Sequence, residues 1–188
     1  MKNLIVLIFI FVSYDSGECA RQKERQINTE ISTGDSISMV KTIKNFLNWY
    51  KANYIKAYAF RFTTSDANGN YIVDLNECEK YLQHLKSSKE ISHTYLTEWR
   101  KYFKSRVQYF KDNPQNEGPP AGFDFDLVLF NQEPDLILNA VDQLKFSIKE
   151  RNKATAVVEV SGEFVYEFEL SLIKGKWKID YISTANYD

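Results

Sequence analysis

Two aspartates that flank one phenylalanine are the side chains in this sequence best placed to do chemistry. In Asp124-Phe125-Asp126, an extended backbone would direct both carboxylates to the same side of the chain. Glu133 and Asp135 follow soon after. Such a group could bind a cation, or it could accept and donate protons across a pocket. A structural role is the simpler interpretation, because Asp residues after a Gly/Pro loop usually bind nearby backbone and Glu133-Pro134-Asp135 is typical of a helix start.

Aromatic side chains are the second source of candidates, since the chain has 12 Tyr, 13 Phe and 3 Trp. Most of them should form the core. A pocket lined by aromatic rings is nevertheless a common place for apolar ligands to bind. We therefore predict a binding site among Trp49, Tyr50 and Tyr166, with Asp124 and Asp126 as the polar candidates.

Residues 66–77 have part of the pattern of a calcium-binding loop. Oxygen-bearing side chains occupy positions one, three, five, nine and twelve of a twelve-residue loop. The sixth position should be glycine, because its φ is positive, but here it is Tyr71, for which that conformation is costly. A turn at Asn68-Gly69 is the simpler interpretation, and we predict no metal site.

The sequence lacks a recognisable catalytic set. His84 and His93 are the only histidines, and their spacing does not suit a metal site. We expect His84 on the polar side of a helix and His93 beside a helix cap. The sequence has no Ser–His–Asp order, nucleophile elbow, phosphate-binding loop or Cys–His pair. No cofactor is predicted.

The first 19 residues have the layout of a secretory signal. Lys2 precedes the apolar run Leu4–Val12, and small and polar residues follow it. The run is shorter than the roughly 20 apolar residues that span a bilayer. We predict a signal peptide over 1–19 and an exported protein, periplasmic or secreted. Cleavage before Cys19 would give a lipoprotein, whereas cleavage after it would release a soluble chain; lipidation there is the only membrane attachment expected.

The charge balance bears on the class of partner. The sequence has 24 basic and 25 acidic residues, and removal of 1–19 takes away one basic and two acidic ones, which leaves 23 of each. A neutral domain lacks the basic surface of a nucleic-acid-binding protein. It also lacks a polybasic membrane-binding surface. We predict no nucleic-acid partner.

Apolar periodicity divides the rest of the chain into a helical half and a sheet half. A polar, flexible lead-in covers 20–35, and apolar residues three or four apart predict helices over about 36–60, 74–87 and 93–112. Asp35 or Ser36 could cap the first helix, and Ser92 should cap the third. Asn113–Gly122 has three of the four prolines and predicts a loop.

Beyond that loop the apolar period changes to two, which predicts strands with one buried face. In the last strand, alternation puts Trp177, Ile179 and Tyr181 on one face, with Trp177 buried near Leu47 and Tyr50. Helices followed by a strand meander predict an α+β fold. Three N-terminal helices should pack on a curved C-terminal antiparallel sheet, within a single domain over 36–188.

Three stretches resemble a family of small secreted bacterial proteins known only as a domain of unknown function. They are Tyr81–Ser88, the GPPAGFDFD element at Gly118–Asp126, and the terminal strand that contains Trp177. The order of elements resembles the nuclear transport factor two-like, cystatin-like fold. The resemblance spans about residues 37–185. It implies a cone-shaped α+β roll, in which a curved sheet wraps a long helix and encloses a pocket, and it implies no known activity.

Two classes of function are consistent with these features. The first is an exported, non-enzymatic binding protein for an unknown protein partner or a small apolar ligand; an immunity-type protein that neutralises a toxin is one version. The second is a small pocket enzyme in which Asp124 or Asp126 is the base and Tyr hydroxyls stabilise an oxyanion. A carboxylate that faces a closed aromatic pocket would favour the enzyme. One held by loop N–H groups would argue against it.

Overall fold

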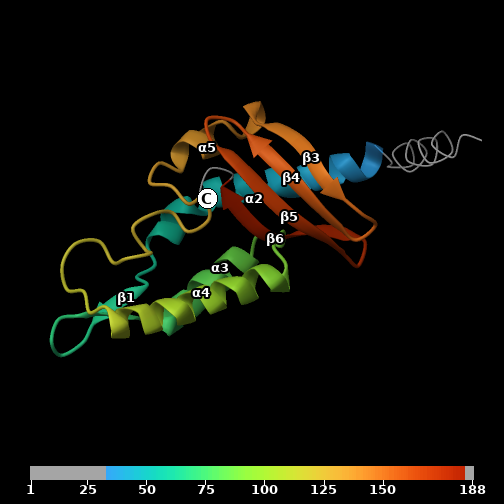
Figure 1. Cartoon of the computed structure of the whole chain (residues 1–188). Coiled ribbons are helices and arrows are strands. Elements are labelled where there is room, and N and C mark those ends of the chain that lie inside the picture. Colours follow the sequence, from blue (N-terminus) through green and yellow to red (C-terminus); the bar gives the residue numbers. More distant parts are fainter. Residues whose placement is uncertain (1–32, 185–188) are drawn as a thin grey trace, which may run out of the picture. The chain divides into compact units, whose positions relative to one another are not determined.

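Within residues 33–184, three long helices precede the main sheet, as predicted. The computed structural model describes residues 33–184, so the predicted signal peptide and Cys19 lie outside the described residues. The helices are α2 (Thr33–Tyr58), α3 (Leu75–Lys86) and α4 (His93–Asp112) (Figure 1). α2 begins three residues inside the predicted lead-in, with Asp35 in its first turn, where a carboxylate stabilises a helix. None of the helices in 33–184 combines the length and apolar character needed to cross a membrane.

Side-chain caps set the starts of two helices. The Asp74 carboxylate accepts hydrogen bonds from the backbone N–H groups of Asn76 and Glu77, at 2.9 and 3.1 Å, and so begins α3. Ser92 Oγ accepts from Tyr95 N at 3.1 Å and begins α4. Each cap satisfies N–H groups that have no partner within the helix. The predicted Ser92 cap is confirmed.

The C-terminal half is an antiparallel meander. Its strands are β3 (Lys145–Arg151), β4 (Thr155–Ser161), β5 (Val165–Ile173) and β6 (Lys176–Thr184), in the order β3-β4-β5-β6 (Figure 1). The α+β prediction is therefore confirmed. A short helix, α5 (Asp135–Asn139), follows the predicted start at Glu133-Pro134-Asp135, and the one-turn helix η1 (Val141–Gln143) leads into β3.

A small hairpin, β1 (Thr63–Ser65) with β2 (Tyr71–Val73), occupies the stretch that looked like a calcium loop. Asp66 Oδ1 accepts from the backbone N–H groups of Asn68 and Asn70, at 2.8 and 2.9 Å. Gly69 has a φ of 84°, a conformation that suits glycine. The carboxylate of Asp66 therefore closes a turn, and the turn interpretation is confirmed.

One face of the main sheet forms the core with α2 (Figure 1). Along β4 and β5 every second side chain is buried, as the period of two predicts. The prediction for the end of β6 is wrong. Glu169 pairs with Tyr181 but Leu170 pairs with Ile179, so Asp180 is an extra residue that reverses the faces beyond it. Tyr181 is consequently 44% exposed and Ile182 only 2%.

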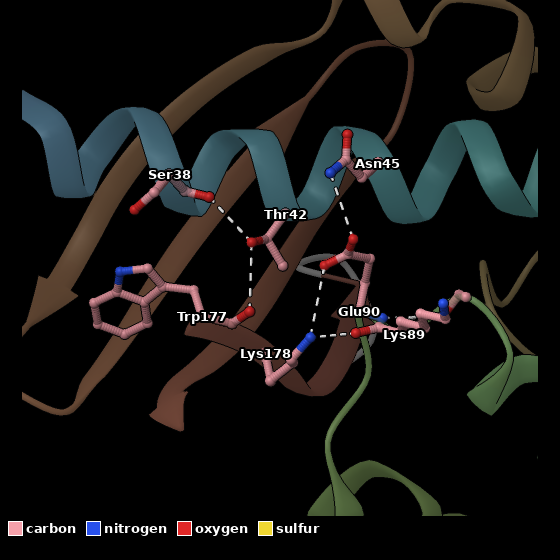
Figure 2. A network of polar contacts seen from close by, with 8 residues as sticks. Ser38, Thr42, Asn45, Lys89, Glu90, Trp177 and Lys178 are labelled. Carbon is pink, nitrogen blue, oxygen red and sulfur yellow. Dashed lines mark hydrogen bonds and ion pairs between the residues drawn. The ribbon is translucent and has the colours of Figure 1, made fainter. Parts of the chain in front are cut away.

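A polar network joins α2 and the link between α3 and α4 to β6 (Figure 2). The Thr42 hydroxyl donates to the Ser38 carbonyl at 3.0 Å and to the Trp177 carbonyl at 3.4 Å. Lys178 Nζ donates to the Lys89 carbonyl and lies 4.0 Å from a Glu90 carboxylate oxygen. The Thr42 contact fixes α2 to β6, and the Lys178 contacts fix the link between α3 and α4 to the same strand.

The same link also bonds to the backbone of β6. Ile179 N donates to the Glu90 carbonyl and Ser92 N donates to the Ile179 carbonyl, each at 2.9 Å. Ile91 thereby forms a parallel bridge with Ile179 at the edge of the sheet. By their contacts, residues Ser36–Asp188 group into one compact unit.

Candidate functional site

An aromatic pocket of about 150 Å³ lies at the C-terminal end of α2, beside α3 and the loop that contains the GPPAGFDFD element. Seven of its eleven lining residues carry aromatic rings. The lining consists of Tyr50, Ala57, Tyr58, Phe60, Arg61, Phe62, Tyr81, Phe123, Phe125, Asp126 and Leu127. The pocket thus combines an apolar wall with one carboxylate and one guanidinium group.

Ring contacts hold the wall of this pocket in place. Tyr81, on the buried side of α3, meets the rings of Phe60 and Phe62 edge to face, with centroids 5.6 and 5.0 Å apart. Phe62 stacks on Phe123 at 5.4 Å. Edge-to-face and offset contacts of this kind stabilise aromatic clusters beyond simple burial. The segment after α2 and the distant loop are therefore packed onto one another through their rings.

The Asp126 carboxylate is bound on both oxygens. Tyr50 Oη donates to its Oδ2 at 2.6 Å. The backbone N–H groups of Val128 and Leu129 donate to its Oδ1 at 3.0 and 2.7 Å. This carboxylate joins α2 to a loop 76 residues away in sequence and fixes the loop's first turn.

Tyr166 fastens the same loop from the sheet. Its hydroxyl donates to the Leu129 carbonyl at 2.8 Å and accepts from Asn131 Nδ2 at 2.8 Å. Asp126 N donates to the Asn131 carbonyl at 2.9 Å, and the Phe130 backbone has a φ of 53°. A phenylalanine in that conformation is uncommon, and it persists here because the surrounding hydrogen bonds enforce it.

Burial controls the electrostatics of the pocket. It raises the pKa of the Asp126 carboxyl, against the opposing effect of the Tyr50 hydroxyl and the two loop N–H groups. Burial also raises the pKa of Tyr50 well above its usual value, and the neighbouring Tyr81 and Asp126 add to that shift. Tyr50 consequently stays a neutral donor toward Asp126 at physiological pH.

The structure brings together two of the five predicted site residues, Tyr50 and Asp126. Tyr166 touches the loop but does not line the pocket. Trp49 packs on Phe46 and His84, away from it. Asp124 is exposed and lines a different, open cavity of about 590 Å³. The two carboxylates do not act together, because the backbone between them is irregular and not an extended strand.

Sequence reasoning missed most of the pocket wall. The burial of Tyr81 could have been predicted, because it follows the buried Cys78 by three residues and so lies on the same helical face. Phe60 and Phe62 lie in the segment after α2, where no periodicity marks a buried side. Their role depends on the loop that packs onto them, which no local pattern specifies.

The structure corrects the predicted position of His84. It was expected on the polar side of its helix, but it is only 8% exposed and packs between Trp49 and Phe60, with ring centroids 5.1 and 5.8 Å away. Its Nε2 has no hydrogen-bond partner among residues 33–184. Burial, together with the charge of Lys56, lowers the pKa of the imidazole.

We expect His84 to make stability depend on pH near neutrality. Because its folded-state pKa lies below the usual value of about 6.5, the unfolded chain binds the proton more readily, and stability falls as pH drops from about 7.5 through 6.5. The slope cannot exceed about 1.4 kcal/mol per pH unit, the linkage limit for one proton. Urea unfolding of wild type and His84→Gln between those pH values would measure it. His84→Gln should lose the part of the slope that the buried imidazole contributes.

No protein-family model matches the chain, and no curated protein or solved structure does either, so the family resemblance of the three stretches stays a prediction.

Proposed function

We propose that this chain is an exported, non-enzymatic binding protein whose ligand occupies the aromatic pocket. The observation that carries the proposal is the state of Asp126. Among residues 33–184 it is the only carboxylate in the pocket lining, and both of its oxygens already accept hydrogen bonds from the protein.

A pocket enzyme would need this carboxylate as a general base. A base must reach the proton that it abstracts. Asp126 Oδ1 is turned toward two loop N–H groups, and Oδ2 lies 2.6 Å from Tyr50 Oη, which donates to it. Breaking these bonds would uncouple the loop from α2. The arrangement therefore supports recognition of a ligand by a rigid site over proton transfer.

The N-terminal sequence supports export, and the fold supports the proposed family resemblance. Lys2 with the apolar run Leu4–Val12 is typical of a signal peptide. A long helix packed on a four-stranded meander is what a cystatin-like, nuclear transport factor two-like domain would have. In this proposal the ligand lies at the end of α2 and not on the sheet, because the inner sheet face is already covered by the core.

Mass spectrometry of the chain recovered from its native host tests both parts of the proposal. Denaturing spectra should give a mature chain that begins between Ser16 and Arg21. Native spectra should show additional mass that is lost on denaturation. Ala57→Leu, which adds bulk to a pocket-lining position, should remove that additional mass.

Ala52→Leu is the matched control, because Ala52 is exposed on the same helix and does not line the pocket. It should retain the bound mass. A chain that starts at Met1 in the cytosol would contradict export. A bare chain from every preparation of the wild type would contradict ligand binding.

A further inference from the structure

We propose that the aromatic pocket binds a small zwitterion, with an alkylammonium group enclosed by the rings beside Asp126 and an acidic group at Arg61. This inference rests on the proposed binding function and names the chemical class of its ligand. It follows from the kinds of group that line the pocket and from where the two charges lie.

The rings favour a cation of low hydration. The faces of Phe and Tyr carry negative charge density, and a cation within about 6 Å of a ring centroid is attracted to it. Aromatic cages recognise quaternary ammonium groups in this way. Phe60 and Phe62 each contact Tyr81 edge to face, and all three rings line the pocket.

Asp126 supplies the matching negative charge. Among the described residues, its carboxylate is the only acidic group in the lining, and no basic side chain lies within ion-pair distance of it. A quaternary alkylammonium group has no N–H and therefore donates no hydrogen bond to the carboxylate. It can therefore be balanced by the charge of Asp126 while Tyr50 and the loop N–H groups keep their bonds to both oxygens.

Arg61 disfavours a simple cation and favours a zwitterion. It is exposed, lines the same pocket, and has no acidic partner within ion-pair distance among residues 33–184. A guanidinium group pairs well with a carboxylate or phosphate. The two charged ends of one small molecule would thus each meet an opposite charge.

The volume of the pocket limits the size of the enclosed group. At about 150 Å³ it matches a cavity known to admit benzene, so it has room for a trimethylammonium group but not for a large ring system. Glycine betaine has both charges in a molecule of suitable size, and it is the probe for the test. The carboxylate anion tert-butylacetate (3,3-dimethylbutanoate) has nearly the same shape as betaine but lacks the positive charge. Tetramethylammonium has the positive charge but lacks the acidic group.

Isothermal titration of the mature chain with these three probes tests the proposal. Glycine betaine should bind saturably. Tert-butylacetate should bind about tenfold more weakly or worse, because it lacks the cation that the rings attract. Tetramethylammonium should also bind more weakly, because it leaves Arg61 unpaired.

Two uncharged variants assign these preferences to the two charges. Asp126→Asn keeps an oxygen for the loop N–H groups and should reduce the preference for betaine over tert-butylacetate, because the rings remain and only the charge of Asp126 is lost. Arg61→Gln should remove the preference for betaine over tetramethylammonium. Ala52→Leu, outside the pocket, should bind the three probes as the wild type does. Arg61 is exposed, so Arg61→Gln tests the proposal even if Asp126→Asn does not fold.

The alternative outcomes are distinct. Equal binding of betaine and tert-butylacetate, or no saturable binding of betaine, would overturn the zwitterion proposal. If native mass spectra still show a bound molecule that Ala57→Leu removes, the binding function stands and only the ligand class is wrong.

Discussion

Replacing Trp177 with alanine should lower the free energy of unfolding by about 3–5 kcal/mol, the usual cost of emptying a large aromatic site in a core. The side chain is only 4% exposed and belongs to the core that α2 forms with the sheet. Its backbone carbonyl accepts from Thr42, and Arg151 lies over its ring at 6.0 Å. Chemical denaturation should show the loss as a lower midpoint, because small domains have only about 5–15 kcal/mol of stability in total.

Tyr181→Ala is the control for this substitution. A regular strand would bury Tyr181 on the face of Trp177, but the extra residue at Asp180 leaves it 44% exposed. Its removal should cost about 1 kcal/mol or less. If both variants lost the same stability, the bulge would be misplaced. If Trp177→Ala melted like the wild type, the inward face of β6 would be wrong.

Asp126→Ala should cost about 2–4 kcal/mol. Two loop N–H groups would lose their acceptor, a loss comparable with that of a helix cap, and the nearly buried Tyr50 hydroxyl would lose its partner. We also expect the loop around Phe130 to open more often. Hydrogen exchange at Val128 and Leu129, measured alongside denaturation, would report this opening directly.

Two further substitutions, Asp124→Ala and Asp126→Asn, separate the loss of the hydrogen bonds at Asp126 from the loss of its charge. Asp124→Ala removes an exposed carboxylate two residues earlier and should change stability by about 0.5 kcal/mol or less. Asp126→Asn retains an acceptor for the loop and should lose less than Asp126→Ala. An Asp126→Ala variant as stable as Asp124→Ala would show that the bonds to Asp126 do not hold the loop.

The helices were predictable because their signals are local. Asp74 and Ser92 each precede an apolar stripe of helical period, and each caps the helix that follows. The strands were predictable for the same reason, since alternation over seven to nine residues leaves one buried face. A helix or strand can be predicted from its own segment alone where that segment contains both a cap or turn residue and a clear apolar period.

The predictions of the fold were wrong where a residue distant in sequence determines the local structure. The extra residue at Asp180 depends on pairing with β5, so alternation along β6 alone assigned Tyr181 to the wrong face. His84 was expected on the polar side of its helix, yet α2 and the segment after it cover that side with Trp49 and Phe60. The burial of a residue on the border of a helical stripe is decided by the element packed against it.

The candidate site was predictable only in part. Tyr50 and Asp126 were both named from their residue types, but their pairing spans 76 positions and no periodicity connects them. Trp49 and Asp124 were named for the same reasons and lie elsewhere. Tyrosine and aspartate are common in cores and turns, so residue type alone does not identify a site. The fold shows which of the candidates lie together.

The link at Glu90–Ser92 has a consequence for self-association. A strand edge with free N–H and C=O groups is a template for pairing with another chain, and β6 alternates buried apolar residues that would favour such pairing. Ile91 occupies that edge at Ile179, while the opposite edge, β3, carries exposed Lys145 and Lys149 and an irregular register near Ile148. One edge of the sheet is covered and the other is charged and bent. A break in the link would therefore free the N–H and C=O groups of β6 at Ile179 for pairing with another chain.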